Sequence, residues 1–186
     1  MMEAAEMPHI EISSGLPGIT GLLESRLDTS EPIRELTQTI MRGESSLTEG
    51  ERELIASIVC DGNECKFCTR AHTTTAARFV GSLELVQSII ADPMASPLHP
   101  RISRLLVMAA AVRSSPQGVS QELVDDARNA GATDLEIHDT ILIAALFCMY
   151  NRYVDGLASV CPDNDEYFDT LADRLSSQGY VRKGLS

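Results

Sequence analysis

Hydrophobic residues recur every three or four positions in successive segments of this chain, with polar residues between them. That period places the apolar side chains on one face of an α-helix, and no segment shows the sustained two-residue alternation of a half-buried strand. We therefore predict an all-α domain. The expected helices cover residues 16–27, 30–43, 48–60, 64–80, 82–91, 101–113, 120–130, 133–157 and 167–175.

Capping residues mark several of the expected helix ends. Thr48, followed three residues later by Glu51, forms a capping box, and Ser120 is placed to cap the helix that follows it. Asn63 is the expected N-cap of the helix that begins near residue 64. Gly131 follows a predicted helix at the position where a left-handed residue is favoured.

The chain has 186 residues, which suits one domain with a core large enough to fold without disulfides or a structural metal. We place this helical domain at residues 16–178, with a flexible segment over 1–15 before it and a polar tail over 179–186 after it. A proline-rich connector over 93–100 divides the domain into two helical halves.

Composition and charge narrow the function classes. Hydrophobic residues make up 44% of the chain and charged residues 23%, as in ordinary globular proteins. A net charge of −12 repels phosphate backbones and anionic membrane surfaces, so nucleic-acid and membrane partners are not expected. The longest apolar run, Ile141 to Met149, is about half of a membrane span, and residues 1–12 lack the features of a signal peptide. We expect a soluble cytoplasmic protein.

Candidate redox chemistry lies in one short stretch. Cys65 and Cys68 form a Cys-x-x-Cys pair, and His72 follows four residues after the second cysteine, so the three side chains share one face of a helix. Both cysteines fall in the first turns of that helix, where the macrodipole and free N–H groups favour thiolate over thiol. A thiolate attacks peroxides and disulfides. The odd total of five cysteines argues against a secreted disulfide framework, so the close pair indicates metal or redox chemistry.

Glu53 is the expected partner of His72. It lies seven residues before Cys60 in one predicted helix, and His72 lies seven residues after Cys65 in the next. In an antiparallel helical hairpin both side chains would stand about 10 Å from the turn, at a rise of about 1.5 Å per residue. The spacing therefore permits a Glu–His–Cys proton relay, and the rotation of the helices decides whether the two faces meet.

Other interpretations of these residues stay open at this point. The cysteines could be two packed thiols, and Glu53 could be a solvated helix residue. Cys65, Cys68 and His72 are good zinc ligands, but the sequence lacks a second Cys or His pair to supply a fourth. Haem attachment needs histidine directly after the second cysteine, where this chain has Thr69. No phosphate loop or nucleotide fingerprint occurs, so no cofactor and no metal is expected.

Several short motifs occur together along the chain. They are Glu53 with Cys65-Lys-Phe-Cys68-Thr-Arg-Ala-His72, Leu16-Pro17-Gly18-Ile19, Gly21-Leu22-Leu23, Met41-Arg42-Gly43, Leu47-Thr48, Glu51-Arg52-Glu53-Leu54-Ile55-Ala56 and Asn151-Arg152. Their combination resembles the AhpD-like alkylhydroperoxidases of the carboxymuconolactone decarboxylase superfamily, and in particular a peroxidase-related subgroup. The resemblance covers residues 16 to about 158.

The resemblance implies an all-helical fold, assembly into homo-oligomers and a dithiol peroxidase activity. It implies that Cys68 attacks the hydroperoxide and becomes a sulfenic acid, which Cys65 resolves to an intramolecular Cys65–Cys68 disulfide. Glu53 and His72 would move the protons. The order of the residues agrees, because His72 lies four residues after Cys68. Cys65, nearer the helix end, is expected to be the more exposed thiol and available to an external reductant.

Phe67 departs from the pattern, since well-known enzymes of this family carry a second histidine just before the second cysteine. This change removes one member of the relay, and the aromatic ring is expected to shape an apolar pocket for an organic hydroperoxide. We therefore expect a thiol-dependent peroxidase. One alternative is a lactone enzyme like the carboxymuconolactone decarboxylases, which generally lack the paired cysteines. Another is a non-enzymatic redox-sensing or zinc-binding oligomer.

The remaining cysteines and histidines are given structural or surface roles. Cys60 is interpreted as a packed helix cysteine, although as a third thiol it could exchange with the pair. Cys148 is interpreted as a core residue and Cys161 as an inert loop residue. The other histidines, none of which has a cysteine partner in sequence, are His9, His99 and His138. Asn151 and Arg152 are interpreted as capping or interface groups.

Overall fold

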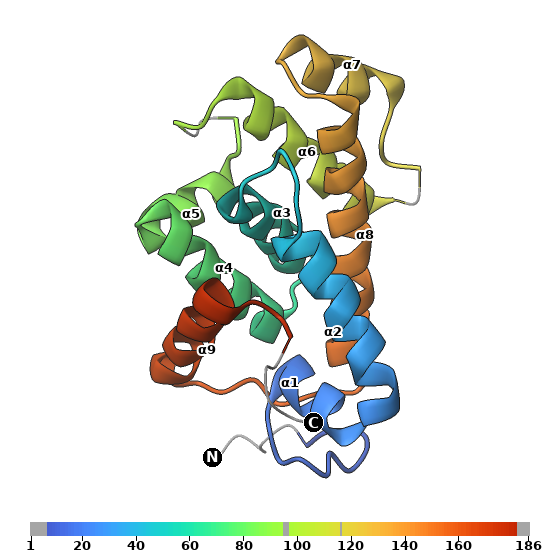
Figure 1. Ribbon diagram of the computed structural model, residues 1–186, viewed down its shortest axis with the longest axis vertical. Helices are drawn as coiled ribbons and strands as arrows, with labels where there is room; N and C mark the ends of the chain where they lie inside the picture. The colour runs from blue at the N-terminus through green and yellow to red at the C-terminus, as the bar shows by residue number, and fades with distance from the viewer. Residues whose placement is uncertain (1–6, 95–96, 116, 182–186) are drawn as a thin grey trace, which may run out of the picture.

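The computed structural model describes residues 7–94, 97–115 and 117–181, and every regular element in these ranges is a helix (Figure 1). In chain order the helices are α1 (Gly18–Ser25), α2 (Leu27–Arg42), α3 (Glu49–Gly62), α4 (Lys66–Val80), α5 (Leu83–Ala91), α6 (Pro100–Ser114), α7 (Gln121–Asn129), α8 (Asp134–Gly156) and α9 (Asp165–Gln178). The all-α prediction is confirmed. None of the helices in these ranges combines the length and apolar character that a membrane crossing requires. Parts of the predicted N-terminal segment, connector and tail (1–6, 95–96 and 182–186) lie outside the described residues.

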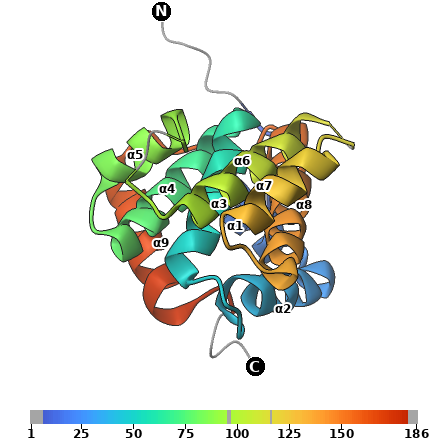
Figure 2. The same cartoon turned by 90° about the horizontal axis from the view of Figure 1, so that it is seen from above.

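Helix α3 runs through the middle of the core. Its residues from Arg52 to Cys60 are all buried, on every face of the helix. A helix that buries its whole circumference needs neighbours on all sides, and α4, α6 and α8 pack against it. Figure 2 shows α3 surrounded by these helices. A polar side chain on this part of α3, such as Glu53, is therefore removed from bulk water.

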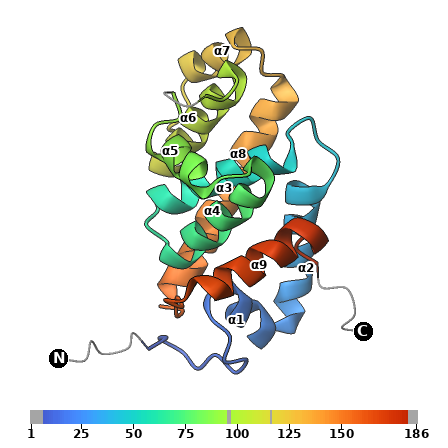
Figure 3. The ribbon, with the colours of Figure 1, turned by 90° about the vertical axis from the view of Figure 1, so that its left-hand side faces the viewer.

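Helix α9 brings the end of the chain onto the first half of the fold. It packs against α4, and Figure 3 shows it crossing the molecule at the end where α1 and α2 lie. Arg78 of α4 donates hydrogen bonds to Asp169 and Asp173 of α9, at 2.7 Å each. Such exposed pairs contribute at most about 1 kcal/mol each. The buried apolar side chains of α9, including Phe168 and Leu171, therefore contribute more to its docking.

Most of the expected helix ends are present. Thr48 and Glu51 form a reciprocal capping box at the start of α3, which confirms the sequence prediction. The side chains of Ser120 and Thr133 cap α7 and α8. Gly131 has a φ of +98°, a conformation that glycine adopts without steric cost, so the chain can turn after α7.

The predicted start of α2 is wrong by one turn. The helix begins at Leu27 and not near residue 30. The carbonyl of Arg26 accepts the N–H of Ser30 at 3.0 Å, so the first helical turn closes before the residues that resembled a cap. Helix α1 accordingly ends at Ser25, two residues before its predicted end.

The predicted cap of α4 is also wrong. Asn63 ends α3, and α4 begins at Lys66 with Cys65 as its N-cap residue. Glu64 separates the two helices because its φ of +60° cannot continue a right-handed helix. The side chain of Asn63 donates instead to Asn151 Oδ1 of α8, at 2.8 Å. This change places Cys65 at the very start of α4.

Candidate active site

The α3–α4 hairpin brings Glu53 and His72 together. Each lies in the second turn of its helix, and His72 Nδ1 is 2.8 Å from Glu53 Oε2. The rotation of the helices, which the spacing left open, thus brings the two side chains into contact, whereas their catalytic roles stay a prediction. Glu53 is completely buried and His72 is 7% exposed. With Glu53 ionised, Nδ1 carries a hydrogen and donates a hydrogen bond to the carboxylate. Nε2 is therefore the ring nitrogen that can accept a proton.

Glu53 is held as a carboxylate by its surroundings. Its Oε1 accepts hydrogen bonds from Arg42 Nη2 and from the Tyr180 hydroxyl, at 2.6 Å each. Burial by itself raises the pKa of the Glu53 carboxyl. The hydrogen bond and charge of His72 and the charge of Arg42 outweigh that effect, so this pKa lies below its ordinary value. The imidazole therefore faces a fixed negative charge.

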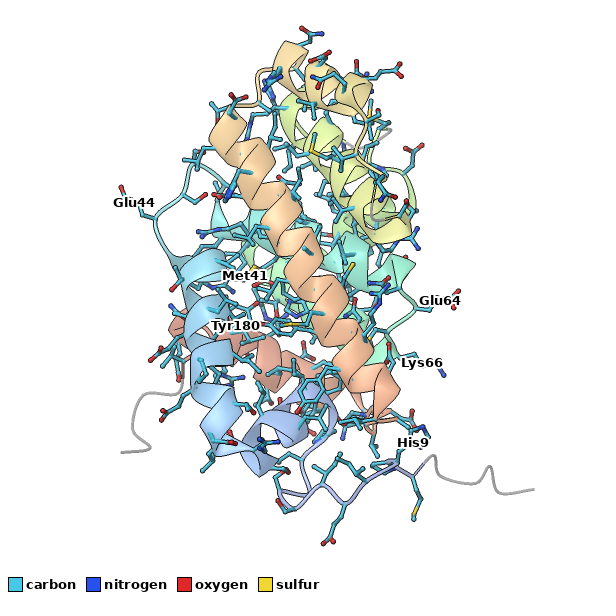
Figure 4. All side chains as sticks on the ribbon, turned by 90° about the vertical axis from the view of Figure 1, so that its right-hand side faces the viewer. His9, Met41, Glu44, Glu64, Lys66 and Tyr180 are labelled. Atoms are coloured by element: carbon cyan, nitrogen blue, oxygen red, sulfur yellow. The ribbon has the colours of Figure 1, made fainter. Side chains whose placement is uncertain are left out.

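Arg42 and Tyr180 reach Glu53 from opposite ends of the chain. Arg42 ends α2, and its guanidinium carbon lies 5.0 Å from the ring centre of Tyr180 and 5.3 Å from that of Phe79. Tyr180 follows α9, in the segment predicted as a tail, and is partly buried; Figure 4 shows it between α2 and α8. Neither residue was predicted from the sequence to be part of the site. Arg42 belongs to one of the recognised motifs, whereas no local pattern marks Tyr180.

Cys65 and Cys68 occupy the start of α4. Cys65 is the N-cap and Cys68 the third helical residue, with exposed fractions of 0% and 3%. The expectation that Cys65 is the more exposed thiol is therefore wrong, because Asp155 near the end of α8 contacts its sulfur. The N–H of Cys65 donates to the carbonyl of Cys60 at 3.2 Å. All three cysteines are free thiols, and the thiols of Cys60 and Cys65 neighbour that of Cys68.

Neither thiol of the pair is activated in the reduced state. The hydrogen bond with Cys68, together with burial, raises the pKa of Cys65 far above its ordinary value. The pKa of Cys68 is also raised, chiefly by its interaction with Cys60 and by burial, against opposing hydrogen bonds from Cys65 and Asn151. The expected preference for thiolate at the helix start is therefore wrong, since burial and neighbouring thiols outweigh the helix dipole. Forming the thiolate requires a base.

Asn151 of α8 is a further polar residue beside the sulfur atoms. It is 1% exposed, and its Nδ2 donates to Cys60 Sγ at 3.3 Å. The same side chain neighbours Cys68 and lowers the pKa of its thiol, against the larger effects that raise it. Its expected role as a capping or interface group is wrong, because the amide is buried between α3, α4 and α8. The signal was its place in one of the recognised motifs.

A pocket of about 80 Å³ reaches Cys68 and His72. Its walls come from α1, α2, α4, α8 and α9 and are mostly apolar, with Ile19, Ile33, Phe67, Phe147, Leu171 and Leu175 among the lining residues. The hydroxyls of Thr37 and Tyr150, 2.5 Å apart, are polar points in the wall. One water occupies about 10–15 Å³ of such space, so the pocket has room for several waters or a small organic group.

Phe67 forms part of this wall. Its ring centre lies 5.5 Å from that of Phe168 and 6.1 Å from that of Tyr167. Gly18 of α1 lies against the same ring, and a Cβ added there would come within 2.4 Å of ring atoms. With a φ of +56°, Gly18 is needed both for its backbone conformation and for this close approach. Phe67 thus shapes an apolar wall, and the binding of a hydroperoxide there stays a prediction.

The other cysteines and histidines lie elsewhere. His99 accepts the N–H of Arg101 at the start of α6, at 3.2 Å, and His138 is exposed on α8. Cys161 is half-buried in the loop before α9, and Cys148 is partly buried on α8. Within the part of the chain that the structure describes, no three His, Cys, Asp or Glu side chains are grouped so that they would hold a metal ion.

No family model and no curated protein matches this chain. Solved structures do match it. An uncharacterized peroxidase-related protein from Silicibacter sp. TM1040 has a TM-score of 0.74 at 24% identity, over 84% of this chain and 81% of that one. A peroxidase-related protein from Ralstonia eutropha JMP134, described as an alkylhydroperoxidase AhpD core, has a TM-score of 0.74 at 22% identity, over 86% and 83%. The debrominase Bmp8 has a TM-score of 0.71 at 16% identity, over 84% and 83%.

These similarities show that the chain has the AhpD-like helical fold. More particularly, it is the fold of the peroxidase-related structures, shared over most of each chain. Bmp8 has also been solved as a cysteine-to-alanine variant in complex with 2,3,4-tribromopyrrole, so proteins of this fold include one with a different activity. The fold does not decide the reaction, which has to be argued from the site.

Proposed function

We propose that this protein is a thiol-dependent peroxidase that reduces organic hydroperoxides through Cys68 and Cys65. One observation carries the proposal. Cys68 and His72 line the same apolar pocket, while the Nδ1 of His72 contacts the buried carboxylate of Glu53. The nucleophile Cys68 and the base His72 therefore lie beside a space for a substrate, and Glu53 orients the base.

The reaction follows from these positions. His72 Nε2 accepts the proton of Cys68, and the thiolate attacks the terminal oxygen of the hydroperoxide. An S–O bond forms as the O–O bond breaks, and His72 returns the proton to the leaving alkoxide to give an alcohol. The Cys65 sulfur then attacks the sulfenic sulfur of Cys68, an S–S bond forms and water leaves. Two thiols become one disulfide, and the hydroperoxide becomes an alcohol and water.

The raised pKa values of the two thiols support the need for His72 in this sequence. A buried neutral thiol reacts slowly with oxidants, because the thiolate is the nucleophile. Cys68 lines the pocket with His72, so a substrate that enters the pocket meets both the thiol and the base that ionises it. The reduced protein would then resist oxidants that do not enter the pocket.

The lining of the pocket indicates the class of substrate. Its mostly apolar walls favour the alkyl or aryl part of an organic hydroperoxide, whose O–O group would lie toward Cys68. An external dithiol must then return the disulfide to two thiols. Assembly into homo-oligomers is part of the same proposal.

The test is a single-turnover measurement on the reduced protein. One equivalent of cumene hydroperoxide is added, free thiols are blocked with N-ethylmaleimide in denaturant, and the peptides are analysed by mass spectrometry. We expect a disulfide between Cys65 and Cys68, with the loss of two hydrogens and one equivalent of alcohol. Cys68→Ser should abolish both, whereas Cys161→Ser, at a thiol outside the pocket, should not. Failure of the wild-type protein to form alcohol and disulfide would overturn the proposal.

Thiol-dependent reductive dehalogenation is a second candidate, favoured by the similarity of the fold to the debrominase Bmp8 and by the apolar pocket that reaches a thiol. Here the Cys68 thiolate would take the halogen, a proton would replace it on carbon, and Cys65 would displace halide to form the same disulfide. The experiment above, repeated with 2,3,4-tribromopyrrole, separates the two candidates. Bromide release without any reduction of cumene hydroperoxide would favour dehalogenation.

A further inference from the structure

A third thiol lies against Cys68. Cys60, in the last turn of α3, is completely buried, and its thiol neighbours that of Cys68. The hydrogen bond of 3.2 Å from the N–H of Cys65 to the carbonyl of Cys60 holds the end of α3 against the start of α4. Cys68 therefore has two thiol neighbours in the reduced protein, one from each helix of the hairpin.

The buried amide of Asn151 distinguishes Cys60 from an ordinary packed cysteine. Its Nδ2 lies 3.3 Å from Cys60 Sγ. Asn63 Nδ2 donates to the Oδ1 of the same amide at 2.8 Å, and this contact fixes which end of the amide faces the sulfur. A hydrogen-bond donor at a sulfur atom stabilises the thiolate, the form in which a thiol attacks or leaves in disulfide exchange. Cys60 thus has the surroundings of a reactive sulfur.

We propose that Cys60 is a second resolving thiol for Cys68, an inference that rests on the peroxidase function proposed above. When Cys68 is a sulfenic acid, the Cys60 sulfur attacks the Cys68 sulfur. The S–S bond forms, the S–O bond breaks, and the hydroxyl group leaves as water with the Cys60 proton. The result is a Cys60–Cys68 disulfide, formed without any oxidant beyond the hydroperoxide.

Cys65 then replaces Cys60 as the partner of Cys68. Its sulfur attacks that of Cys68, the Cys65–Cys68 bond forms, and Cys60 leaves as a thiolate that Asn151 stabilises and that takes up the proton from Cys65. This exchange moves no net electrons. The Cys65 sulfur is buried against Asp155, an exposed residue near the end of α8, so a reductant must displace this side chain to reach the disulfide. Cys60 shortens the life of the sulfenic acid, which a second hydroperoxide would otherwise convert irreversibly to sulfinic acid.

The test removes the Cys65 thiol and identifies the group to which the oxidised Cys68 sulfur becomes bonded. The full-length Cys65→Ser variant is reduced, mixed with one equivalent of cumene hydroperoxide in the presence of dimedone, and blocked with N-ethylmaleimide. Trypsin with Asp-N cleaves before Asp61 and after Lys66, so the three cysteines fall on separate peptides. We expect a Cys60–Cys68 disulfide with the loss of two hydrogens. The Cys60→Ser/Cys65→Ser variant should instead carry dimedone on Cys68.

The outcomes separate the two proposals. If the wild-type protein forms the Cys65–Cys68 disulfide but Cys65→Ser gives only dimedone-labelled Cys68, the role of Cys60 is overturned and the peroxidase stands. If Cys68 remains unmodified in both proteins, the peroxidase itself fails. A Cys68–Cys148 disulfide in Cys65→Ser would overturn the role of Cys60 and assign it to Cys148, whereas Cys65→Ser/Cys148→Ser should still form the Cys60–Cys68 disulfide. Cys65→Ala, which adds no polar atom, provides the same measurement if serine disturbs folding.

Discussion

The two ends of the α3–α4 hairpin are buried alike but differ in charge. The carboxylate end consists of Glu53, Arg42, His72 and Tyr180, and the sulfur end of Cys60, Cys65, Cys68 and Asn151. At the carboxylate end, Glu53 accepts hydrogen bonds of 2.6 to 2.8 Å from its three partners and stays ionised. At the sulfur end, the thiols neighbour one another and the pKa values of Cys65 and Cys68 are raised, so these two thiols are neutral in the reduced protein.

This difference fits two kinds of chemistry. A proton relay needs fixed positions, because proton transfer requires a donor and an acceptor within hydrogen-bond distance. The ion pair with Arg42 and the hydroxyl of Tyr180 hold Glu53 in one position. Disulfide chemistry needs a sulfur that can exchange one partner for another, and Cys68 has two thiol neighbours that allow this. His72 joins the two ends, since it contacts Glu53 and lines the pocket with Cys68.

Replacing His72 should break the connection between the two ends. In His72→Gln we expect Cys68 to be oxidised about 10²–10⁴-fold more slowly by cumene hydroperoxide, the usual contribution of a positioned base. The amide of glutamine can still bond Glu53 but accepts no proton near neutral pH. The measurement is the rate of thiol loss in a stopped-flow instrument. His138→Gln, an exposed histidine on α8, is the matched control and should retain the wild-type rate. An unchanged rate in His72→Gln would exclude it as the base.

Neutralising Glu53 should destabilise the protein more than any change at the sulfur end. Glu53→Gln leaves the charge of Arg42, whose side chain is 5% exposed, without its buried partner. Removing one partner of a buried ion pair costs about 3–5 kcal/mol. Urea unfolding of the two proteins at pH 7 measures the difference in the free energy of unfolding.

Glu49→Gln is the matched control for this change. Glu49 lies 4.0 Å from Arg42 Nε, but its side chain is 40% exposed, so we expect a loss below about 1 kcal/mol. The pH dependence adds a second check. Because the pKa of Glu53 is lowered by folding, its stabilisation is present above the ordinary carboxyl pKa and is lost as the pH falls through the lowered value. Glu53→Gln should therefore flatten the acid side of the stability curve. Equal losses in the two variants would contradict a buried pair.

The parts of the site that the sequence predicts are those that depend on local spacing. Cys68 and His72 lie one helical turn apart, and the capping box at Thr48 places the start of α3. Counting residues from the hairpin turn then predicts that Glu53 and His72 are level, as observed. These relations follow from helix geometry alone.

The remaining features depend on contacts between distant segments. Tyr180 lies 127 positions from Glu53, and Asn151 lies 91 positions from Cys60, so no local period relates either pair. The pKa values of the thiols were predicted in the wrong direction for the same reason. The sequence predicts that the two thiols lie near the start of a helix. It does not predict that α8 buries them or that Cys60 contacts Cys68. The prediction that Cys65 is exposed was wrong for the same reason, because Asp155, which contacts its sulfur, lies on α8.

Removing the Tyr180 hydroxyl should weaken the carboxylate end without neutralising it. Tyr180→Phe keeps the aromatic ring on Arg42 and loses one hydrogen bond to a carboxylate, a contribution of about 1.5–3 kcal/mol. We expect a smaller loss in the free energy of unfolding than in Glu53→Gln, again by urea unfolding. Tyr153→Phe, on α8, is a control of the same chemistry outside the site. A loss as large as that of Glu53→Gln would mean that the hydroxyl, and not the ion pair, dominates this end.

The contrast in charge predicts the pH dependence of the sulfur end. Because the pKa of Cys68 is raised, its alkylation by iodoacetamide in the reduced protein should rise about tenfold per pH unit from about pH 7 to 9, without levelling off. The sign for stability is the reverse of that for Glu53. The stabilisation is complete below the ordinary thiol pKa and is lost as the pH rises toward the raised values. Mass spectrometry of the Cys68 peptide gives the alkylation rate, with unfolded protein as the reference thiol. A rate that levels off below pH 8 would mean that Cys68 is already ionised, and the two ends of the hairpin would then both be charged.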